Sequence, residues 1–305
     1  MTKTITPTRN VEAYLESFTE FQKIAAGRDV PWLRDLREEA FARFCEVGFP
    51  TTHDEDWRFT NVSAIARTRF QLASTIPDEG SQGELEALRI PEMRCQLVFV
   101  NGCFRPELSL MGKLPAGVKV GSLAEEIRSN PQAIEPHLGR YLDIRRDPFS
   151  ALNTAFAEDG AFVHIRKGVV VEEPIYFLFV STGGHEALMS HPRNLVIAEG
   201  ASEAIIVEDY VSLDGSTAFC NTATELVAGE SAVVSHFMIE RENRQSFNIS
   251  TLRIQQGRSA NIASHSVLLG GGLVRNNVHP VLAGEGSECL INGLFVGSGR
   301  QHLDN

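Results

Sequence analysis

The sequence has few cysteines, a deficit of basic residues and no long apolar run. Its five cysteines are odd in number, widely spaced and without a C-x-x-C pair, which fits a reducing compartment better than a disulfide framework. With 28 Lys plus Arg against 39 Asp plus Glu, the net charge is −11, so neither nucleic acid nor an anionic membrane is an expected partner. The densest apolar run, Ile175 to Val180, is too short to span a bilayer. The first residues resemble no secretion or import signal, and we expect a cytoplasmic protein.

Short motifs that carry enzyme chemistry are also missing. The sequence contains no H-E-x-x-H, G-x-x-x-x-G-K-[ST] or G-x-S-x-G, so zincin, P-loop and hydrolase-elbow sites have no local support. The run 270–272 is three glycines without the lysine and hydroxyl of a phosphate cradle, and we interpret it as a corner of the chain. His236 and His265 follow their nearest repeat glycines by seven and eight residues, which places them on opposite faces of a sheet and argues against a shared metal site. No catalytic, cofactor-binding or metal-binding residue is predicted.

Two of the cysteines, Cys220 and Cys289, lie in the most regular part of the sequence. A cysteine can hold iron or sulfur, but a lone cysteine is more often a small buried apolar residue. A structural role is favoured for both, and the sequence leaves their function open.

Apolar spacing predicts helices in the first part of the chain. One is expected over 11–25 with Asn10 as its cap, and a second from Pro31 to the glycine at 48. A loop anchored by Trp57 and Phe59 follows, then a linker at 78–83. The run Cys95–Val100 and the Asn-Gly after it predict a strand entering a hairpin turn. We divide the chain into a helical region 1–90, a mixed α/β connection 91–160 with helices after 122, and a repetitive region 161–305.

The repetitive region is built on four glycines. Gly200, Gly229, Gly257 and Gly284 are spaced by 29, 28 and 27 residues, and a serine follows each of them. Alternating apolar residues flank each glycine, with Ile205, Val234 and Ile262 five residues after it and Leu290 displaced by one. A unit of this kind cannot bury its apolar side alone, but stacked units can. The pattern predicts a mainly β fold, a parallel β-helix with coils of about 28 residues, and a β-sandwich is the structural alternative.

Four segments together resemble the SufB/SufD family, and of its two branches more closely SufD. They are Asp54-Glu-Asp-Trp-Arg-Phe-Thr-Asn61, Leu152-Asn-Thr-Ala-Phe-Ala-Glu-Asp-Gly160, His191-Pro-Arg-Asn194 and Gly270-Gly-Gly-Leu-Val-Arg-Asn276. The resemblance implies an N-terminal helical region followed by a right-handed parallel β-helix. It also implies a non-catalytic scaffold subunit of the SUF iron-sulfur cluster assembly machinery, which pairs with SufB and the ATPase SufC, with a cluster held only in the full complex.

The family continues past the point that matches the last residues of this chain, with a Cys-x-His segment and helices that dock SufC. We therefore expect a C-terminally truncated chain that is poorly soluble alone, and carry no site residue over from the family. Two other functions stay open. One is a β-helix enzyme acting on acidic polysaccharide, with Arg166, Lys167, Arg241 and Arg244 as anion binders, and the other is a generic solenoid that binds a partner along its strands.

Overall fold

The computed structural model describes residues 11–75, 82–183, 186–213 and 215–305. The helices are α1 (Glu12–Ile24), α2 (Pro31–Val47), α3 (Ser63–Arg67), α4 (Gln82–Ala87), α5 (Leu123–Ser129), α6 (Pro131–Ile134) and α7 (Pro148–Ala155), with short 3-10 turns η1 (Glu55–Trp57), η2 (Ala73–Thr75) and η3 (Pro106–Leu108). The strands of the first half are β1 (Gln71–Leu72), β2 (Cys95–Val100), β3 (Cys103–Phe104), β4 (Leu110–Met111), β5 (Val118–Ser122), β6 (Ala161–Ile165) and β7 (Ile175–Ser181). Those of the second half are β8 (Leu188–Ser190), β9 (Arg193–Ala198), β10 (Glu203–Ser212), β11 (Ala218–Ala228), β12 (Val233–Arg241), β13 (Phe247–Gln256), β14 (Asn261–Leu268), β15 (Leu273–Leu282), β16 (Glu288–Phe295) and β17 (His302–Asp304).

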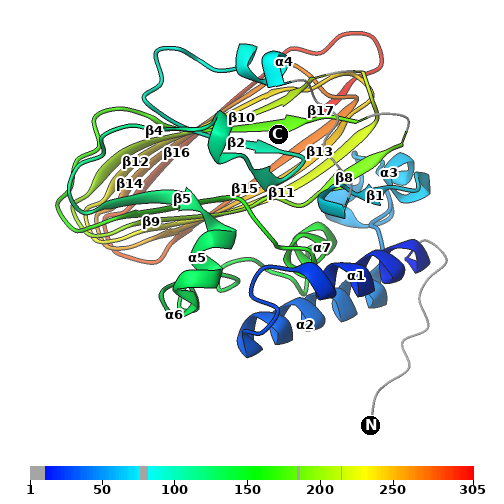
Figure 1. The fold of residues 1–305 in the computed structure, drawn as a ribbon, viewed down its shortest axis with the longest axis horizontal. Helices are drawn as coiled ribbons and strands as arrows, with labels where there is room; N and C mark the ends of the chain where they lie inside the picture. Colours follow the sequence, from blue (N-terminus) through cyan, green and yellow to red (C-terminus); the bar gives the residue numbers. More distant parts are fainter. Residues whose placement is uncertain (1–10, 76–81, 184–185, 214) are drawn as a thin grey trace.

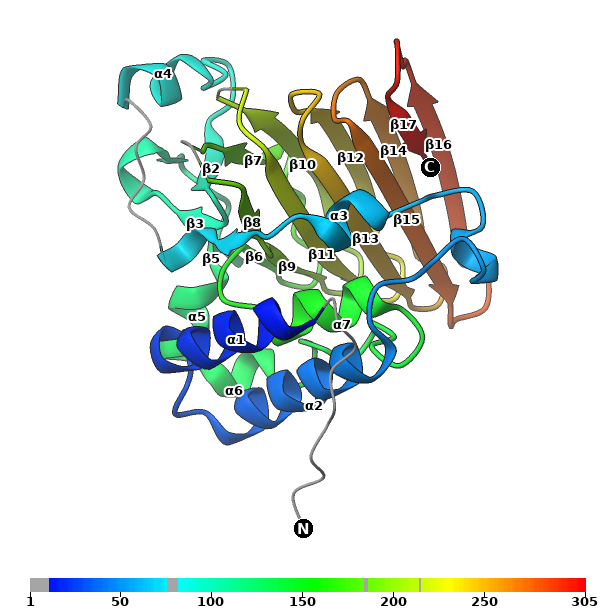
Figure 2. The ribbon, with the colours of Figure 1, turned by 90° about the vertical axis from the view of Figure 1, so that its right-hand side faces the viewer.

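Two sheets form the body of the molecule (Figure 1, Figure 2). From β9 onward the chain alternates between them: β9, β11, β13, β15 and β17 belong to the first sheet, and β10, β12, β14 and β16 to the second. Strands one coil apart pair in parallel, and the offset from Val233 in β12 to Asn261 in β14 is 261 − 233 = 28 residues. The structure is the predicted parallel β-helix, and its parallel pairing excludes the antiparallel sandwich.

The repeat glycines lie where the backbones of consecutive coils come close together. A Cβ atom on Gly229 would stand 2.6 Å from the backbone nitrogen of Gly200, and one on Gly257 would stand 3.0 Å from that of Glu230. Real Cβ atoms essentially never come this near to backbone atoms, so a side chain at Gly229 would force the coils apart. Glycine therefore recurs once per coil because the closely stacked corners leave no room for a side chain.

The predicted alignment of the first coil is wrong by one residue. Ala201 and Ser231 share a left-handed backbone, with φ of 55° and 59°, so they are the equivalent corner residues. The β10–β12 register accordingly pairs Ala204 with Val234, and not Ile205 as the glycine spacing suggested. The slip arises because the first coil carries its glycine one residue later in the corner than the second coil does.

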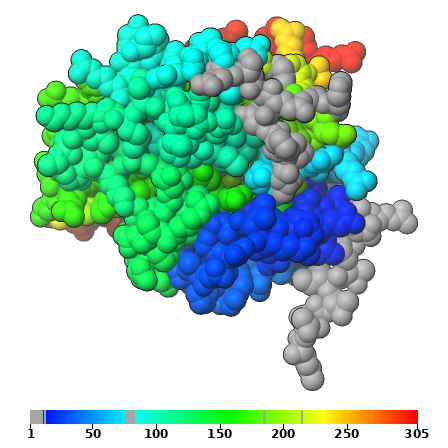
Figure 3. Space-filling model, in the orientation of Figure 1, coloured from blue at the N-terminus to red at the C-terminus, as the bar shows by residue number. Residues whose placement is uncertain are grey.

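The N-terminal helices form a layer against the first sheet (Figure 2). α2 begins at Pro31 and ends before Gly48, as predicted, and α1 follows the predicted apolar spacing. Phe18 of α1 stacks on Phe41 of α2 with ring centroids 4.0 Å apart, and the edge of Phe156 meets both rings. Asn10 and most of the predicted linker at 78–83 lie outside the described residues. In Figure 3 the blue surface of α1 and α2 is continuous with the green surface beside it.

The hairpin and the aromatic loop were predicted with different success. β2 and β3 pair antiparallel through Asn101 and Gly102, whose φ angles of 52° and 82° are those of the expected turn. In the loop before α3, Trp57 is buried, but Phe59 is 83% exposed. The prediction that Phe59 anchors this loop is wrong, because its ring lies at the surface, where the Arg58 guanidinium is 5.6 Å from the ring centroid.

Candidate functional site

The interior of the solenoid changes from apolar to polar across its width. Near the glycine corners the inward column of the second sheet consists of Ala204, Val234 and Ile262, and a few residues further along each strand it contains His236 and Glu208. We call this second part the polar interior. Its buried members are Glu208, Tyr210, Thr222, Thr224, His236, Glu240, Glu242, Asn248, Ser250, Ser264, Ser266 and Asn276.

Glu208 is the best-satisfied charge of the polar interior. Its carboxylate accepts hydrogen bonds from the Tyr210 hydroxyl at 2.5 Å and from Thr224 Oγ1 at 2.7 Å, and His236 Nε2 lies 3.2 Å away. Burial alone would raise the pKa of Glu208, but the hydrogen bonds and the charge of His236 hold that pKa below its usual value. His265, predicted on the opposite face, stacks outside the sheet on Phe237 with ring centroids 4.9 Å apart.

Two further acids, Glu240 and Glu242, lie at the end of β12. Glu242 accepts hydrogen bonds from Ser181 Oγ at 2.7 Å and from Asn248 Nδ2 at 2.9 Å, and its own N–H donates to Glu240 Oε1 at 2.9 Å. Burial, and then the neighbouring Glu242, raise the pKa of Glu240 to about 9. Glu240 therefore carries a proton at neutral pH, and burial raises the pKa of Glu242 as well.

Of the two cysteines in the repeats, Cys220 is buried and Cys289 is half-buried. Cys220 is buried beside Thr222, with Sγ 3.2 Å from Oγ1, and burial, with Glu242 nearby, raises the pKa of its thiol. Cys289 pairs with Ile262 in the last coil, whereas Leu290, which was expected at this place, is exposed. Burial raises the pKa of Cys289 as well. Thiols with raised pKa are weak nucleophiles and poor metal ligands, because both roles require the thiolate.

The charged residues of the polar interior were missed by the sequence analysis. A signal was available, because Val234, His236, Met238 and Glu240 alternate with outward residues at the strand period of two. A glutamate at an inward position of such a strand must be buried, and a buried glutamate needs partners or a proton.

The second and third family segments contact each other. Arg193 is fully buried and donates through Nη2 to Glu225 at 2.7 Å and through Nη1 to Asn153 Oδ1 at 3.0 Å. Asn153 Nδ2 in turn donates to the carbonyl oxygens of Pro192 and Asn221, each at 2.8 Å. These side chains fasten α7 to β9 and β11, so their chemistry is that of a structural junction.

The first and fourth family segments form a second junction at the far end of the same sheet. The Arg275 guanidinium lies 4.1 Å from the Trp57 ring centroid and 3.0 Å from Asp304 Oδ2. Trp57 also packs on Phe149 of α7, with ring centroids 4.9 Å apart, and Thr60 donates to the Asp304 carboxylate. The loop before α3 is thereby held against β15 and β17.

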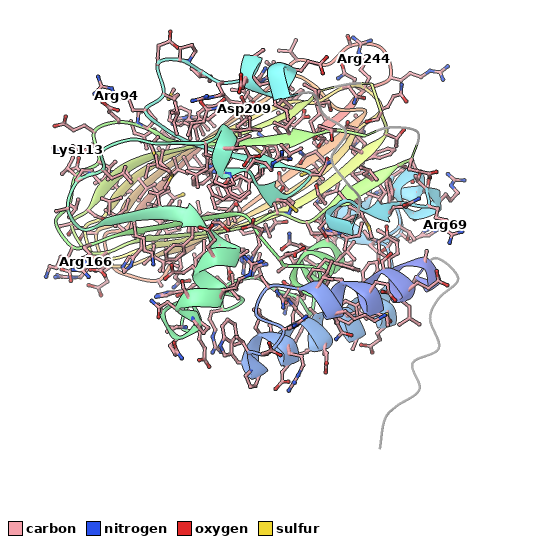
Figure 4. The ribbon with its side chains drawn as sticks, in the orientation of Figure 1. Arg69, Arg94, Lys113, Arg166, Asp209 and Arg244 are labelled. Carbon is pink, nitrogen blue, oxygen red and sulfur yellow. The ribbon has the colours of Figure 1, made fainter. Side chains whose placement is uncertain are left out.

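The four cations proposed as polysaccharide ligands are not brought together. Arg166 and Arg244 lie on opposite sides of the molecule (Figure 4). Arg241 is committed to Asp209, to which it donates from Nε at 2.9 Å and from Nη2 at 2.8 Å. Only Arg166 and Lys167 share a surface, the cleft considered below.

The structure contains no prepared metal centre in the part of the chain it describes. No group of three or more His, Cys, Asp or Glu side chains is arranged there to hold an ion. Of the described helices, none is long and apolar enough to cross a membrane.

Two protein-family models match the chain in succession. The SufBD protein N-terminal region matches residues 8–177, and the SUF system FeS cluster assembly, SufBD core domain matches residues 179–305. Both junctions described above join residues of one matched region to residues of the other. The division predicted at residues 90 and 160 stays a prediction.

Three curated relatives lie at 25–28% identity, and each is longer than this chain. An iron-sulfur cluster assembly SufBD family protein of Synechocystis is 28% identical over 303 residues, covering 96% of this chain and 66% of the relative. The iron-sulfur cluster assembly protein SufD of Escherichia coli is 27% identical over 262 residues, covering 85% and 58%. SufD of Bacillus subtilis is 25% identical over 298 residues, covering 95% and 66%. The chain thus spans about 58–66% of these relatives' length, and with family matches from residue 8 to residue 305 it belongs to the SufB/SufD family of the SUF iron-sulfur cluster assembly system.

Proposed function

We propose that this chain is a cytoplasmic, non-catalytic scaffold subunit of iron-sulfur cluster assembly that pairs with a SufB-like subunit and works with a SufC-like ATPase. The observation that carries the proposal is the pair of family matches, which run in succession over residues 8–177 and 179–305. Relatives named for iron-sulfur cluster assembly, two of them SufD, support the same role.

The residues of the family segments make structural contacts, as expected of a scaffold subunit. Arg193 and Asn153 hold a helix on the solenoid, and Trp57 and Arg275 hold a loop on it. Burial raises the pKa of both repeat cysteines, which disfavours the thiolate. We therefore place cluster, iron and sulfur chemistry in the assembled complex and assign none of it to this chain alone.

Anaerobic affinity purification of the endogenous protein followed by native mass spectrometry tests the partnership. We expect a complex that contains a SufB-like and a SufC-like protein, absent when an unrelated acidic protein carries the same tag. Recovery of the protein at full yield without either partner would overturn the proposal.

A separate measurement tests the proposal that this chain has no catalytic activity of its own. The purified chain and the reconstituted complex are compared for ATP hydrolysis, cysteine desulfuration, and iron and acid-labile sulfide content. We expect ATP hydrolysis and cluster only in the complex. Turnover, or a stoichiometric cluster, in the chain alone would contradict a purely structural role while leaving the partnership intact.

A further inference from the structure

A cleft of about 990 Å³ opens on the outer face of the first sheet. β5, β6 and β9 form its floor, and α5 and α6 form one wall. Figure 1 shows α5 and α6 beside β5 and β9. No residue of the four family segments lines it. Its volume is at the upper end of the roughly 300–1,000 Å³ typical of small-molecule sites.

The charge of the cleft is opposite to that of the molecule. The chain carries 39 acids against 28 Lys plus Arg, but the cleft is lined by three of the cations, Lys119, Arg166 and Lys167, and by two acids, Glu126 and Glu199. A local excess of positive charge in a concave surface attracts anions, because the low-dielectric walls focus the field.

Both acids of the cleft are already engaged. Glu126 pairs with the Lys119 ammonium group, and Glu199 Oε1 lies 2.8 Å from His164 Nε2. Glu199 Oε2 accepts the backbone N–H of Lys167 at 3.0 Å. Within the part of the chain that the structure describes, the side chains of Arg166 and Lys167 have no ion-pair partner.

The cleft also offers uncharged contacts. Phe162 and Ile197 lie at the base of the cleft but are only 2% and 7% exposed, and the Lys119 ammonium lies 5.9 Å from the centroid of the Phe162 ring. His137 lines the wall, and its Nδ1 is buried without a hydrogen-bond partner among the described residues. Free cations at the edge of a cleft of about 990 Å³ suit a ligand that has an anionic group and an organic body.

We propose that this cleft binds a small organic phosphate, with Arg166 and Lys167 on the phosphate and the organic part toward the wall that contains Ala133 and His137. Phosphate is favoured over a carboxylate because its several charged oxygens can accept from both cations, which are neighbours in the sequence and line the same cleft. The site is independent of the proposed scaffold role, since it uses none of the residues at the two motif junctions.

Isothermal titration of the purified protein with pyrophosphate and with AMP tests the proposal at constant ionic strength. Arg166→Ala/Lys167→Ala removes the free cations, and Arg69→Ala/Arg244→Ala is the control with the same charge change on another part of the surface (Figure 4). We expect saturable one-to-one binding that weakens at least about tenfold in the cleft variant and stays within about twofold in the control, because charge-assisted hydrogen bonds to phosphate are the strong class.

Three outcomes would overturn the proposal. They are no saturable binding of either probe, equal weakening in both double variants, and succinate binding as tightly as pyrophosphate. Hydrogen exchange with AMP present provides a second readout, for which protection of β6 and α6 is expected. Thermal unfolding of both variants shows whether they fold. Because the substituted side chains are exposed, we expect little change in Tm.

Discussion

The Arg193 guanidinium and the Glu225 carboxylate form an ion pair at 2.7 Å that is shielded from solvent on every side. The pair lies between the helical layer and the solenoid. The same carboxylate accepts the backbone N–H groups of Gly139 at 2.8 Å and Tyr141 at 2.9 Å, so one side chain organises three segments.

Removing one partner of this pair leaves an unpaired charge in a dry interior. Glu225→Gln should lower the free energy of unfolding by about 3–5 kcal/mol, as for other buried pairs that lose one member. The matched control is Glu230→Gln, which breaks the exposed pair with Arg258 and should cost at most about 1 kcal/mol. Urea denaturation monitors both variants, and equal losses would refute the assigned role.

Glu240 gives stability a dependence on pH. Its pKa is about 9 in the folded state against the usual 4.5, so the folded protein holds a proton that the unfolded chain releases. The proton on Glu240 contributes its full share to the free energy of unfolding below pH 4.5. This contribution is lost as the pH rises toward 9, with a slope of up to about 1.4 kcal/mol per pH unit. Glu240→Gln should reduce this slope in urea denaturation between pH 6 and pH 9, and the raised pKa of Glu242 leaves a smaller slope of the same sign. Parallel profiles for wild type and variant would contradict the assignment.

The close approach of coils at the corners can be tested with a single methyl group. Gly229→Ala would place a Cβ 2.6 Å from the backbone nitrogen of Gly200 and should cost about 1–3 kcal/mol, as overpacking does. Gly121→Ala is the control, since nothing lies within 4 Å of its added Cβ, and it should change stability by less than about 0.5 kcal/mol. Chemical denaturation decides, and a tolerated Gly229→Ala would disprove the steric argument.

The two aromatic residues of the first family segment should respond in opposite ways. Trp57→Ala removes a buried ring between Phe149 and Arg275 and should destabilise the protein by about 3–5 kcal/mol. Phe59→Ala removes a ring that is 83% exposed and should be nearly neutral. Limited proteolysis should cut the loop before α3 faster in the Trp57 variant only. Similar cleavage of both variants would argue against the second junction.

Elements set by local periodicity were predictable from the sequence. α2 could be bounded by Pro31 and Gly48, and the turn at Asn101 by its side-chain chemistry, because each signal lies within a few residues. The repeat glycines predicted the coils for the same reason. The one-residue slip at Ala201 was not predictable from spacing, because inter-coil hydrogen bonds choose the register.

The two junctions and the pair of Glu240 and Glu242 could not be predicted without the three-dimensional structure. Arg193 meets Asn153 and Glu225 across 40 and 32 residues of sequence, and no local pattern encodes such a meeting. Glu240 owes its raised pKa to burial and to its neighbour Glu242, which depend on how the end of the strand is covered. The sequence could predict whether a segment is a helix or a strand, but not which side chains contact one another in the folded protein.

The helical layer limits how this molecule can change in evolution. A free solenoid gains or loses coils easily, because each coil contacts only its neighbours. Here the segment from Tyr141 to Phe149 reaches β11, where its backbone meets Glu225, and β13, where Arg253 Nε donates to the Tyr141 carbonyl at 2.8 Å. Through Trp57 on Phe149 the layer also reaches Arg275 on β15. Inserting or deleting one coil here would misalign all these contacts at once, so the braced part of the molecule has a fixed length.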